Sequence, residues 1–270
     1  MRGRLLLHLC TWILVVTALL FARCRDEQPG TINVVATTSV LGSIIKAIGR
    51  NHVTVTTIVP AGMCPGHFDI TSQHIKNLED SKAFFNHGWE IWIEKLITAA
   101  DRKPALFTIN VTGNIMVPPM HKQAAAYVAE VLCSLDQAHQ SQYVNNFTIY
   151  SNAIDSVTAI LEKQRAGYDS VKVVCAELQE EFITWVGLDV VTTYARAEDL
   201  TPKMLEQIIT KSRDAHVFLV IDNMQSGADA GKIIAEQINA RRVVLTNFPL
   251  NGSYIDAVME NFHKLQKVIQ

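Results

Sequence analysis

Cysteine is scarce in this chain of 270 residues, which holds only five. Cys10 and Cys24 belong to the N-terminal leader described below, so the body of the chain retains Cys64, Cys133 and Cys175. Three cysteines outside the cytosol permit one disulfide and one free thiol, and their spacing does not decide which two would pair. This scarcity excludes a small scaffold that depends on several disulfides.

Clusters of positive charge are also missing beyond the first few residues. The chain has 24 Lys and Arg against 26 Asp and Glu, and the two signs are interspersed. A protein that binds phosphate backbones needs a basic patch or stripe. We therefore expect no nucleic-acid partner.

The motifs of several enzyme classes are absent as well. The sequence has no Ser in a nucleophile elbow, no Gly-rich phosphate loop and no His-Glu-x-x-His pattern. Two of its adjacent acidic pairs, at 79–80 and 180–181, are more typical of solvated helix faces than of paired catalytic carboxylates. These absences predict that the protein is not an enzyme.

One long hydrophobic run is present, and it lies at the N-terminus. Two early arginines precede an apolar stretch from Leu5 to Ala22, which is typical of a secretory signal or, at this length, of a membrane anchor. Cys24 resembles the lipidated Cys of a bacterial lipoprotein signal, although Arg23 stands where a small residue is usual. We predict that residues 1–24 are a signal peptide or anchor. The remainder would be exported to the cell surface or periplasm and tethered to the membrane.

The rest of the chain alternates between β-branched segments and amphipathic helical patterns. Strands are expected at 32–38, 53–59, 83–85, 105–109, 171–175, 189–194, 217–221 and 242–246. Strands that alternate with helices are typical of parallel sheets covered on both faces. The predicted fold class is therefore α/β.

A different pattern runs from Gln142 to about Arg165, where apolar residues recur every three or four positions without Gly or Pro. It predicts one long amphipathic helix. We expect two parallel-sheet α/β lobes, at 31–141 and 167–270, bridged by this helix over 142–166. Ligands of open α/β sheets bind at the carboxyl ends of the strands, so a ligand cleft is expected between the lobes.

Three segments in the N-terminal half resemble those of a known family. They are Thr31 to Leu41, the turn from Val59 to Asp69 (VPAGMCPGHFD), and the stretch from Asn86 to Leu96 (NHGWEIWIEKL). Together with the long helix and the segment from Phe182 to Val191, they are similar to the cluster A-I metal-binding receptors of ABC transporters, the zinc and manganese solute-binding proteins.

This resemblance implies a function as well as a fold. It implies two lobes bridged by a rigid helix that allows only small lobe movements, with a divalent metal (Zn, Mn or Fe) held between them by four side chains. The metal would be cargo for an ABC permease with its cytoplasmic ATPase, and no organic cofactor would be needed. We expect the chain to act as a monomer.

Two of the implied ligands match the family. His67 stands at the position of the first family His, and Glu177 matches the third ligand with a slip of one residue. Imidazole and carboxylate groups are common ligands of zinc, manganese and iron. Cys175 is a soft-metal alternative at the same strand end, although a buried strand Cys is usually inert packing.

The other two positions depart from the family. The stretch at 112–119, where the second His is expected, has none; His121 is the nearest substitute, while Asn114 and Met116 stand closer to the expected place. Asn247 occupies the loop where the family has an Asp, and an amide is a weaker ligand. Asp222, at the end of a neighbouring strand, could supply the missing carboxylate. The predicted metal ligands are thus His67, His121, Glu177 and Asp222.

These departures leave two other interpretations open. The same fold could carry a metal chelate or small organic solute, which Asn114, Gln179 and Asn247 could bind through hydrogen bonds. Alternatively, the chain could be a surface adhesion protein, which would be compatible with the Asn-x-Ser/Thr triplets that begin at residues 110, 146 and 251. The identity of a metal cannot be decided from ligand types alone, because geometry and availability govern selectivity.

Overall fold

The structure is a computed structural model that describes residues 30–227 and 229–270, apart from the side chain of His67. Thr31–Gln270 form one compact unit. The predicted leader, residues 1–24, lies outside the described residues. Among the helices of the described part, none is long and apolar enough to span a membrane.

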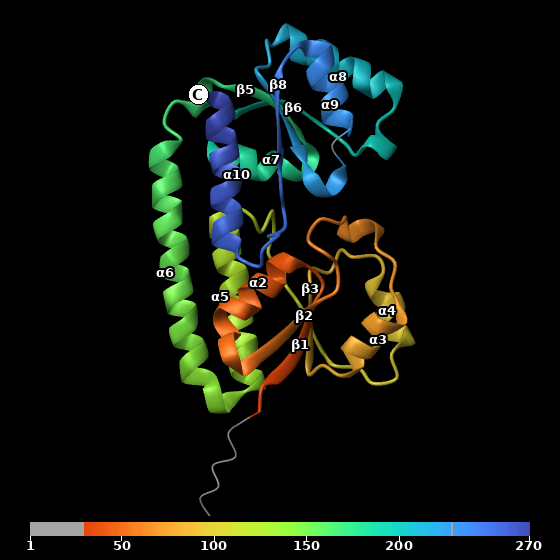
Figure 1. Cartoon of the computed structure of the whole chain (residues 1–270), viewed down its shortest axis with the longest axis vertical. Helices are drawn as coiled ribbons and strands as arrows, with labels where there is room; N and C mark the ends of the chain where they lie inside the picture. Colours follow the sequence, from red (N-terminus) through yellow and green to blue (C-terminus); the bar gives the residue numbers. More distant parts are fainter. Residues whose placement is uncertain (1–29, 228) are drawn as a thin grey trace, which may run out of the picture. The chain divides into compact units, whose positions relative to one another are not determined.

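The N-terminal lobe is built on a parallel sheet with strand order β2-β1-β3-β4 (Figure 1). Its strands are β1 (Ile32–Ala36), β2 (Val53–Thr57), β3 (Ala83–Asn86) and β4 (Ala105–Thr108). The helices are α2 (Ser39–Gly49), α3 (Ser72–Glu79), α4 (Ile93–Ala99) and α5 (Pro118–Leu135). The inner strands are apolar on both faces, and all four residues of β3 are buried, as expected of a parallel sheet covered on both sides.

The C-terminal lobe repeats this architecture with strand order β6-β5-β7-β8, again all parallel. Its strands are β5 (Lys172–Ala176), β6 (Asp189–Tyr194), β7 (Leu219–Asn223) and β8 (Arg241–Leu245). The helices are α7 (Glu180–Val186), α8 (Pro202–Asp214), α9 (Asp229–Ile238) and α10 (Tyr254–Ile269). The predicted N-cap of α8 is observed, because the Thr201 side chain accepts a hydrogen bond from the Met204 N–H.

The long helix α6 (Gln140–Gln164) runs beside both lobes (Figure 1). With 25 residues it is about 37 Å long. Tyr143, near its start, packs into the core of the N-terminal lobe, whereas Ile154 and Leu161 pack into the core of the C-terminal lobe. The fold prediction, two parallel α/β lobes with one long bridging helix, is therefore confirmed.

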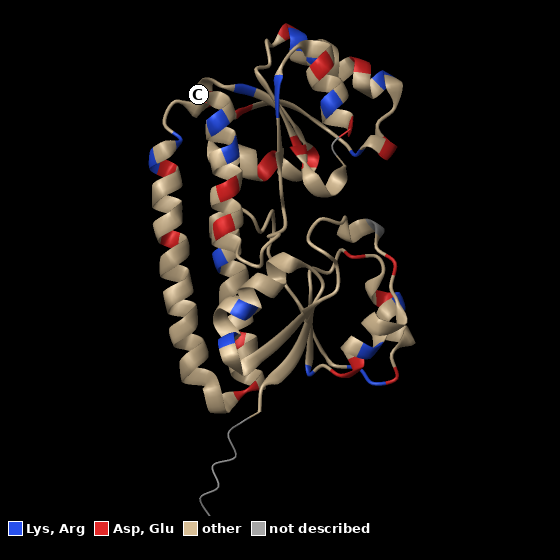
Figure 2. Ribbon diagram, in the orientation of Figure 1, with Lys and Arg blue, Asp and Glu red and all other residues tan. Residues whose placement is uncertain are grey.

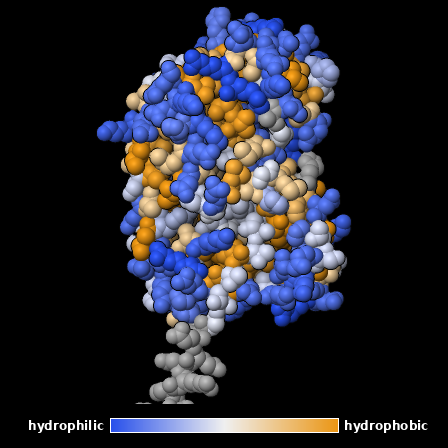
Figure 3. All heavy atoms as spheres, viewed as in Figure 1, coloured by the Kyte–Doolittle hydropathy of each residue, from blue (hydrophilic) through white to orange (hydrophobic). Residues whose placement is uncertain are grey.

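Charged residues of both signs are spread over both lobes (Figure 2). On the face shown in Figure 3, hydrophobic side chains lie in separate groups between hydrophilic ones. Cys133 and Cys175 are free thiols, so no disulfide joins these two.

Asp136 stabilises the turn between α5 and α6 through hydrogen bonds. Its Oδ2 accepts a hydrogen bond from the Tyr143 hydroxyl at 2.7 Å and lies 2.6 Å from His139 Nδ1, and all three residues are buried. Burial by itself raises the pKa of Asp136, but the hydrogen bonds from His139 and Tyr143 and the charges of His139 and Lys82 outweigh it, so the pKa lies below its usual value. The ionised carboxylate therefore stabilises the fold.

We expect Asp136→Asn to lower the free energy of unfolding by about 1–3 kcal/mol at pH 7, because a charged acceptor of buried donors is lost. The folded-state pKa lies below the unfolded value, so this contribution is present above the unfolded pKa and disappears as pH falls through the folded pKa. Urea unfolding from pH 7 to pH 3 measures it. Asp155→Asn, in an exposed pair with Lys122, is the control. A wild-type-to-Asn difference that stays constant across this range would contradict the prediction.

Candidate ligand-binding cleft

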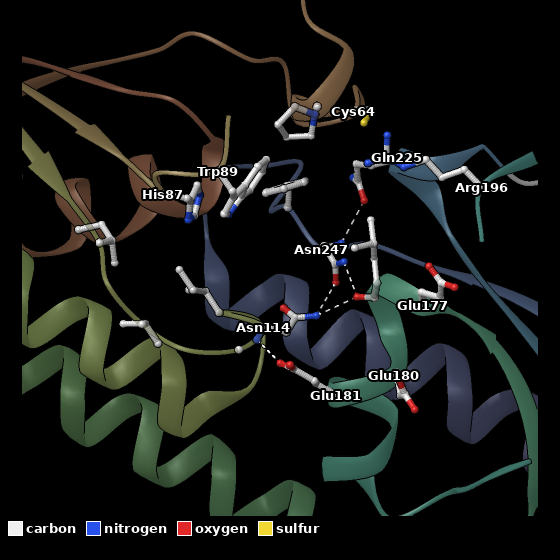
Figure 4. Close-up of a pocket in the computed structure, with 18 residues that line it drawn as sticks. Cys64, His87, Trp89, Asn114, Glu177, Glu180, Glu181, Arg196, Gln225 and Asn247 are labelled. Atoms are coloured by element: carbon white, nitrogen blue, oxygen red, sulfur yellow. Dashed lines mark hydrogen bonds between the residues drawn. The ribbon is translucent and has the colours of Figure 1, made fainter. Parts of the chain in front are cut away.

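A cavity of about 480 Å³ lies between the two lobes. Its lining residues follow strands β2, β3 and β4 of one sheet and all four strands of the other. Those labelled in Figure 4 are Cys64, His87, Trp89, Asn114, Glu177, Glu180, Glu181, Arg196, Gln225 and Asn247. The cleft therefore lies at the carboxyl ends of both sheets, where open α/β folds bind ligands.

Of the two predicted ligands that match the family, Glu177 lines this cleft and His67 directly follows residues that line it. His67 ends a single turn of 3-10 helix, Pro65–His67, whose first two residues line the cavity. The side chain of His67 is outside what the structure describes. Glu177 directly follows β5, is exposed and lines the cavity. Glu180 and Glu181, one helical turn further on, line it as well.

His121 lies elsewhere and is fully buried, on α5 between the bridging helix α6 and helix α10 of the C-terminal lobe. Its Nδ1 is 3.1 Å from the Ile115 carbonyl oxygen, its Nε2 is 2.7 Å from the Tyr150 hydroxyl, and its ring stacks on Tyr254 at a centroid distance of 3.4 Å. Burial lowers the pKa of His121 to about 3, although the Ile115 carbonyl opposes this. Both ring nitrogens of this neutral imidazole are engaged by protein groups, and the ring does not line the cavity.

Asp222 is likewise fully buried and does not line the cavity. It accepts hydrogen bonds from the Tyr194 hydroxyl and from Arg242 Nε, each at 2.5 Å. Cys175, the soft-metal alternative, is buried in the same lobe; burial, together with the charge of Glu180, raises the pKa of its thiol to about 12. A thiol in that state is unreactive packing.

The structure therefore does not bring the four predicted ligands together. Among the side chains that the structure describes, no group of three or more His, Cys, Asp or Glu residues is arranged to hold a metal ion. The side chain of His67 is not among those described. A metal shell in this cleft would have to draw on His67 together with other donors.

Amide side chains form a hydrogen-bonded group in the cleft. Asn114 and Asn247 face one another (Figure 4), with Asn114 Nδ2 3.1 Å from Asn247 Oδ1. Both also donate to the Leu178 carbonyl oxygen, at 3.0 and 2.7 Å. Asn247 Oδ1 accepts a second hydrogen bond from Gln179 Nε2 at 3.1 Å. These three amides are the predicted partners of an organic cargo, and in the structure Asn247 is hydrogen-bonded to both of the others.

His87 was not among the predicted ligands, yet it lines the cavity beside Trp89, on which it stacks at 5.1 Å (Figure 4). Its Nε2 lies 2.8 Å from the Thr38 hydroxyl. Burial lowers the pKa of His87 to about 4, partly opposed by the charge of Glu90, so the ring is neutral at pH 7. The signal for this residue was its position directly after β3.

Sequence comparison relates the chain to metal-uptake proteins. Residues 34–268 match the family described as zinc-uptake complex component A, periplasmic. The manganese-binding lipoprotein MntA of Halalkalibacterium halodurans is 23% identical over 93% of this chain and 95% of its own length. The metal ABC transporter substrate-binding lipoprotein SloC of Streptococcus mutans is 21% identical over 79% of this chain and 78% of its own.

Solved structures of similar fold agree with this relation. A crystal structure of ZnuA superposes with a TM-score of 0.78 at 16% identity, covering 89% of this chain and all of that one. A manganese-bound variant of the periplasmic metal-binding protein of Candidatus Liberibacter asiaticus gives 0.77 at 18% identity, with the same coverage. The family match spans nearly every described residue, so the chain belongs to the zinc-uptake complex component A family of periplasmic proteins.

Proposed function

We propose that the protein is the extracytoplasmic substrate-binding component of an ABC uptake transporter that captures a divalent metal ion between its two lobes. The observation that carries this proposal is a cleft at the carboxyl ends of two parallel sheets, in a chain that matches the family from residue 34 to 268. Manganese is bound by two proteins of similar sequence or fold. The ion would be Zn, Mn or Fe, delivered unchanged to a permease with a cytoplasmic ATPase, so the protein would not be an enzyme.

The metal shell that we propose is centred on His67 and Glu177. The His67 turn and the Glu177 side chain come from opposite lobes and border one cavity. Glu181 is an additional oxygen donor in that cavity. His121 and Asp222, whose polar atoms are hydrogen-bonded to other protein groups, would stabilise the fold around the cleft without binding the metal.

The location follows from the leader and the family. The relatives named above are lipoproteins, and residues 1–24 have the composition of a signal or anchor. We infer that the folded part is held at the outer face of the membrane by this leader or by a lipid on Cys24, as a monomer.

A second cargo is favoured by the size of the cleft. Pockets for small molecules usually measure about 300–1,000 Å³, and this cavity of about 480 Å³ is within that range. Its lining also includes Arg196, Trp89 and Phe248, which suit an anionic or aromatic group rather than a bare cation. A metal chelate or small organic solute is therefore the alternative.

The test is a titration of residues 25–270 with zinc, manganese and ferrous salts, combined with metal analysis of the purified protein. We expect one equivalent to bind, and His67→Ala to weaken binding at least about tenfold, because a ligand is removed. His263→Ala, an exposed histidine on α10, is the control. Failure of wild type and variant alike to bind any of the three metals would overturn metal capture and favour the chelate or organic solute.

A further inference from the structure

Asn114 makes three hydrogen bonds from the N-terminal lobe to the C-terminal lobe. It lies in the loop between β4 and α5. Its backbone N–H donates to the Glu181 carboxylate, and its Nδ2 donates to the Leu178 carbonyl at 3.0 Å and to Asn247 Oδ1 at 3.1 Å. Its own Oδ1 accepts from the Met116 N–H at 2.8 Å, which fixes the orientation of the side chain.

Gln225 makes a second link between the lobes. It follows β7 and is buried. Its Nε2 donates to the Ala61 carbonyl, in the loop after β2, at 2.7 Å, and to Thr246 Oγ1 at 2.8 Å. Its Oε1 accepts from the Asn247 N–H at 3.1 Å.

Asn247 joins the two links into one network. Its Oδ1 accepts from Asn114, its Nδ2 donates to the Leu178 carbonyl at 2.7 Å, and its backbone N–H donates to Gln225. We call Asn114, Gln225, Asn247 and the Leu178 carbonyl the amide clasp. Through it, the loops after β2 and β4 of one lobe are both fastened to the other lobe.

The chemistry of the amide clasp does not require a cargo. Its members are neutral amides and one carbonyl, so they carry no charge that an ion would have to balance. Each amide of the clasp uses protein donors or acceptors at 2.7–3.1 Å, within the normal hydrogen-bond range. Metal ligands from two lobes would instead repel one another or remain solvated until an ion joins them.

We propose that the amide clasp holds the lobes together without cargo and that Asn114 is the positioning residue that sets the width of the cleft. The effect on cargo rests on the proposed function. A protein that is already closed binds with its intrinsic affinity, whereas one that is closed only part of the time has its apparent affinity reduced by the closed fraction. Loss of the clasp would therefore weaken cargo binding as well as open the lobes.

The test measures the distance between the lobes by double electron–electron resonance, with spin labels on non-natural residues at positions 95 and 203. Lys95 on α4 and Lys203 on α8 are exposed, and both helices lie on the side of the lobes away from α6 (Figure 1). With a chelator present, wild type should give one narrow distribution of the distance between the two labels, and adding zinc in place of the chelator should not shift it. Asn114→Ala should give a longer and broader one.

Asn114→Asp separates the clasp from the structure of the loop. It keeps an oxygen for the Met116 N–H but turns an oxygen instead of Nδ2 toward Leu178 and Asn247, so it should open the lobes as Ala does. Asn110→Ala, an exposed asparagine in the same loop, is the matched control and should resemble wild type. Thermal melts establish that each variant is folded.

Two results would overturn the proposal: a wild-type distance that lengthens in chelator and shortens with zinc, or Asn114 variants whose distances equal that of wild type. The comparison of wild type with the Asn114 variants in chelator does not depend on metal binding. It therefore tests whether the amide clasp holds the lobes together even if the proposed function is wrong. Conversely, if the protein binds metal but the Asn114 variants have the same distance between the lobes as wild type, the proposed function stands and the role of the amide clasp is disproved.

Discussion

The double variant Asn114→His/Asn247→Asp is expected to bind zinc at least about 100-fold more tightly than wild type, since even supporting residues of metal sites change affinity by 10–100-fold. The family resemblance predicts a His near Asn114 and an Asp in the loop that holds Asn247. In the structure the two side chains already meet across the cleft, with Nδ2 and Oδ1 3.1 Å apart. An imidazole and a carboxylate placed there would be within reach of one ion, and zinc prefers both groups over amides.

A competition titration against a chelating dye measures this gain, and the thermal melt should become zinc-dependent. At a zinc concentration of 100 times Kd, the bound metal would add about 2.7 kcal/mol to the free energy of unfolding. Asn110→His/Asn251→Asp makes the same two exchanges at exposed positions and is the matched control. Equal zinc affinity in the double variant and wild type would mean that Asn114 and Asn247 do not border the metal position.

In the double variant, closure of the two lobes should depend on a bound zinc ion instead of on the amide clasp. It removes the Nδ2 groups that donate to the Leu178 carbonyl and introduces groups that attract a cation. Closure should then depend on zinc, whereas wild type should stay closed without it. The amide clasp and a full metal shell are thus alternative ways of joining the same two loops.

The sequence was sufficient for the fold because its local signals agree with one another. All eight predicted strands are observed, with ends that differ by no more than two residues. The long helix predicted from Gln142 to Arg165 runs from Gln140 to Gln164. β-branched runs, helical periodicity and caps such as Thr201 each act over a few residues, and here none of them conflicts with burial.

The site was harder to predict because a position at a strand or helix end does not say where the side chain points. Successive residues of a strand face opposite sides of the sheet. Asp222 therefore shares the face of Val220, which packs with α9 residues such as Ile234, and the next residue, Asn223, reaches Gln179 near the cleft. His121, in the first turn of α5, is similarly buried, against Tyr254 of α10.

Asp222→Ala is expected to lower the free energy of unfolding by about 3 kcal/mol, near the low end of the range for breaking a buried ion pair. The carboxylate is fully buried and accepts from Tyr194 and Arg242, whose side chain is 29% exposed. The carboxylate is tightly packed against Gly231: a side chain at that position would place its Cβ 1.9 Å from Asp222 Oδ1. Chemical unfolding measures the loss, and Asp189→Ala, exposed at the start of β6, should cost far less.

Asp222→Asn then distinguishes a supporting role from a role in the metal shell. The amide keeps the volume of the carboxylate and an oxygen that can accept from Tyr194 or Arg242, so the variant should fold with a smaller loss of stability than Asp222→Ala. Because Asp222 does not line the cavity, zinc affinity of the folded Asn variant should equal that of wild type, while His67→Ala loses it. A folded Asp222→Asn protein that no longer binds metal would instead place this carboxylate in the shell, as the sequence predicted, and would require the strand end to turn toward the cleft when the ion binds.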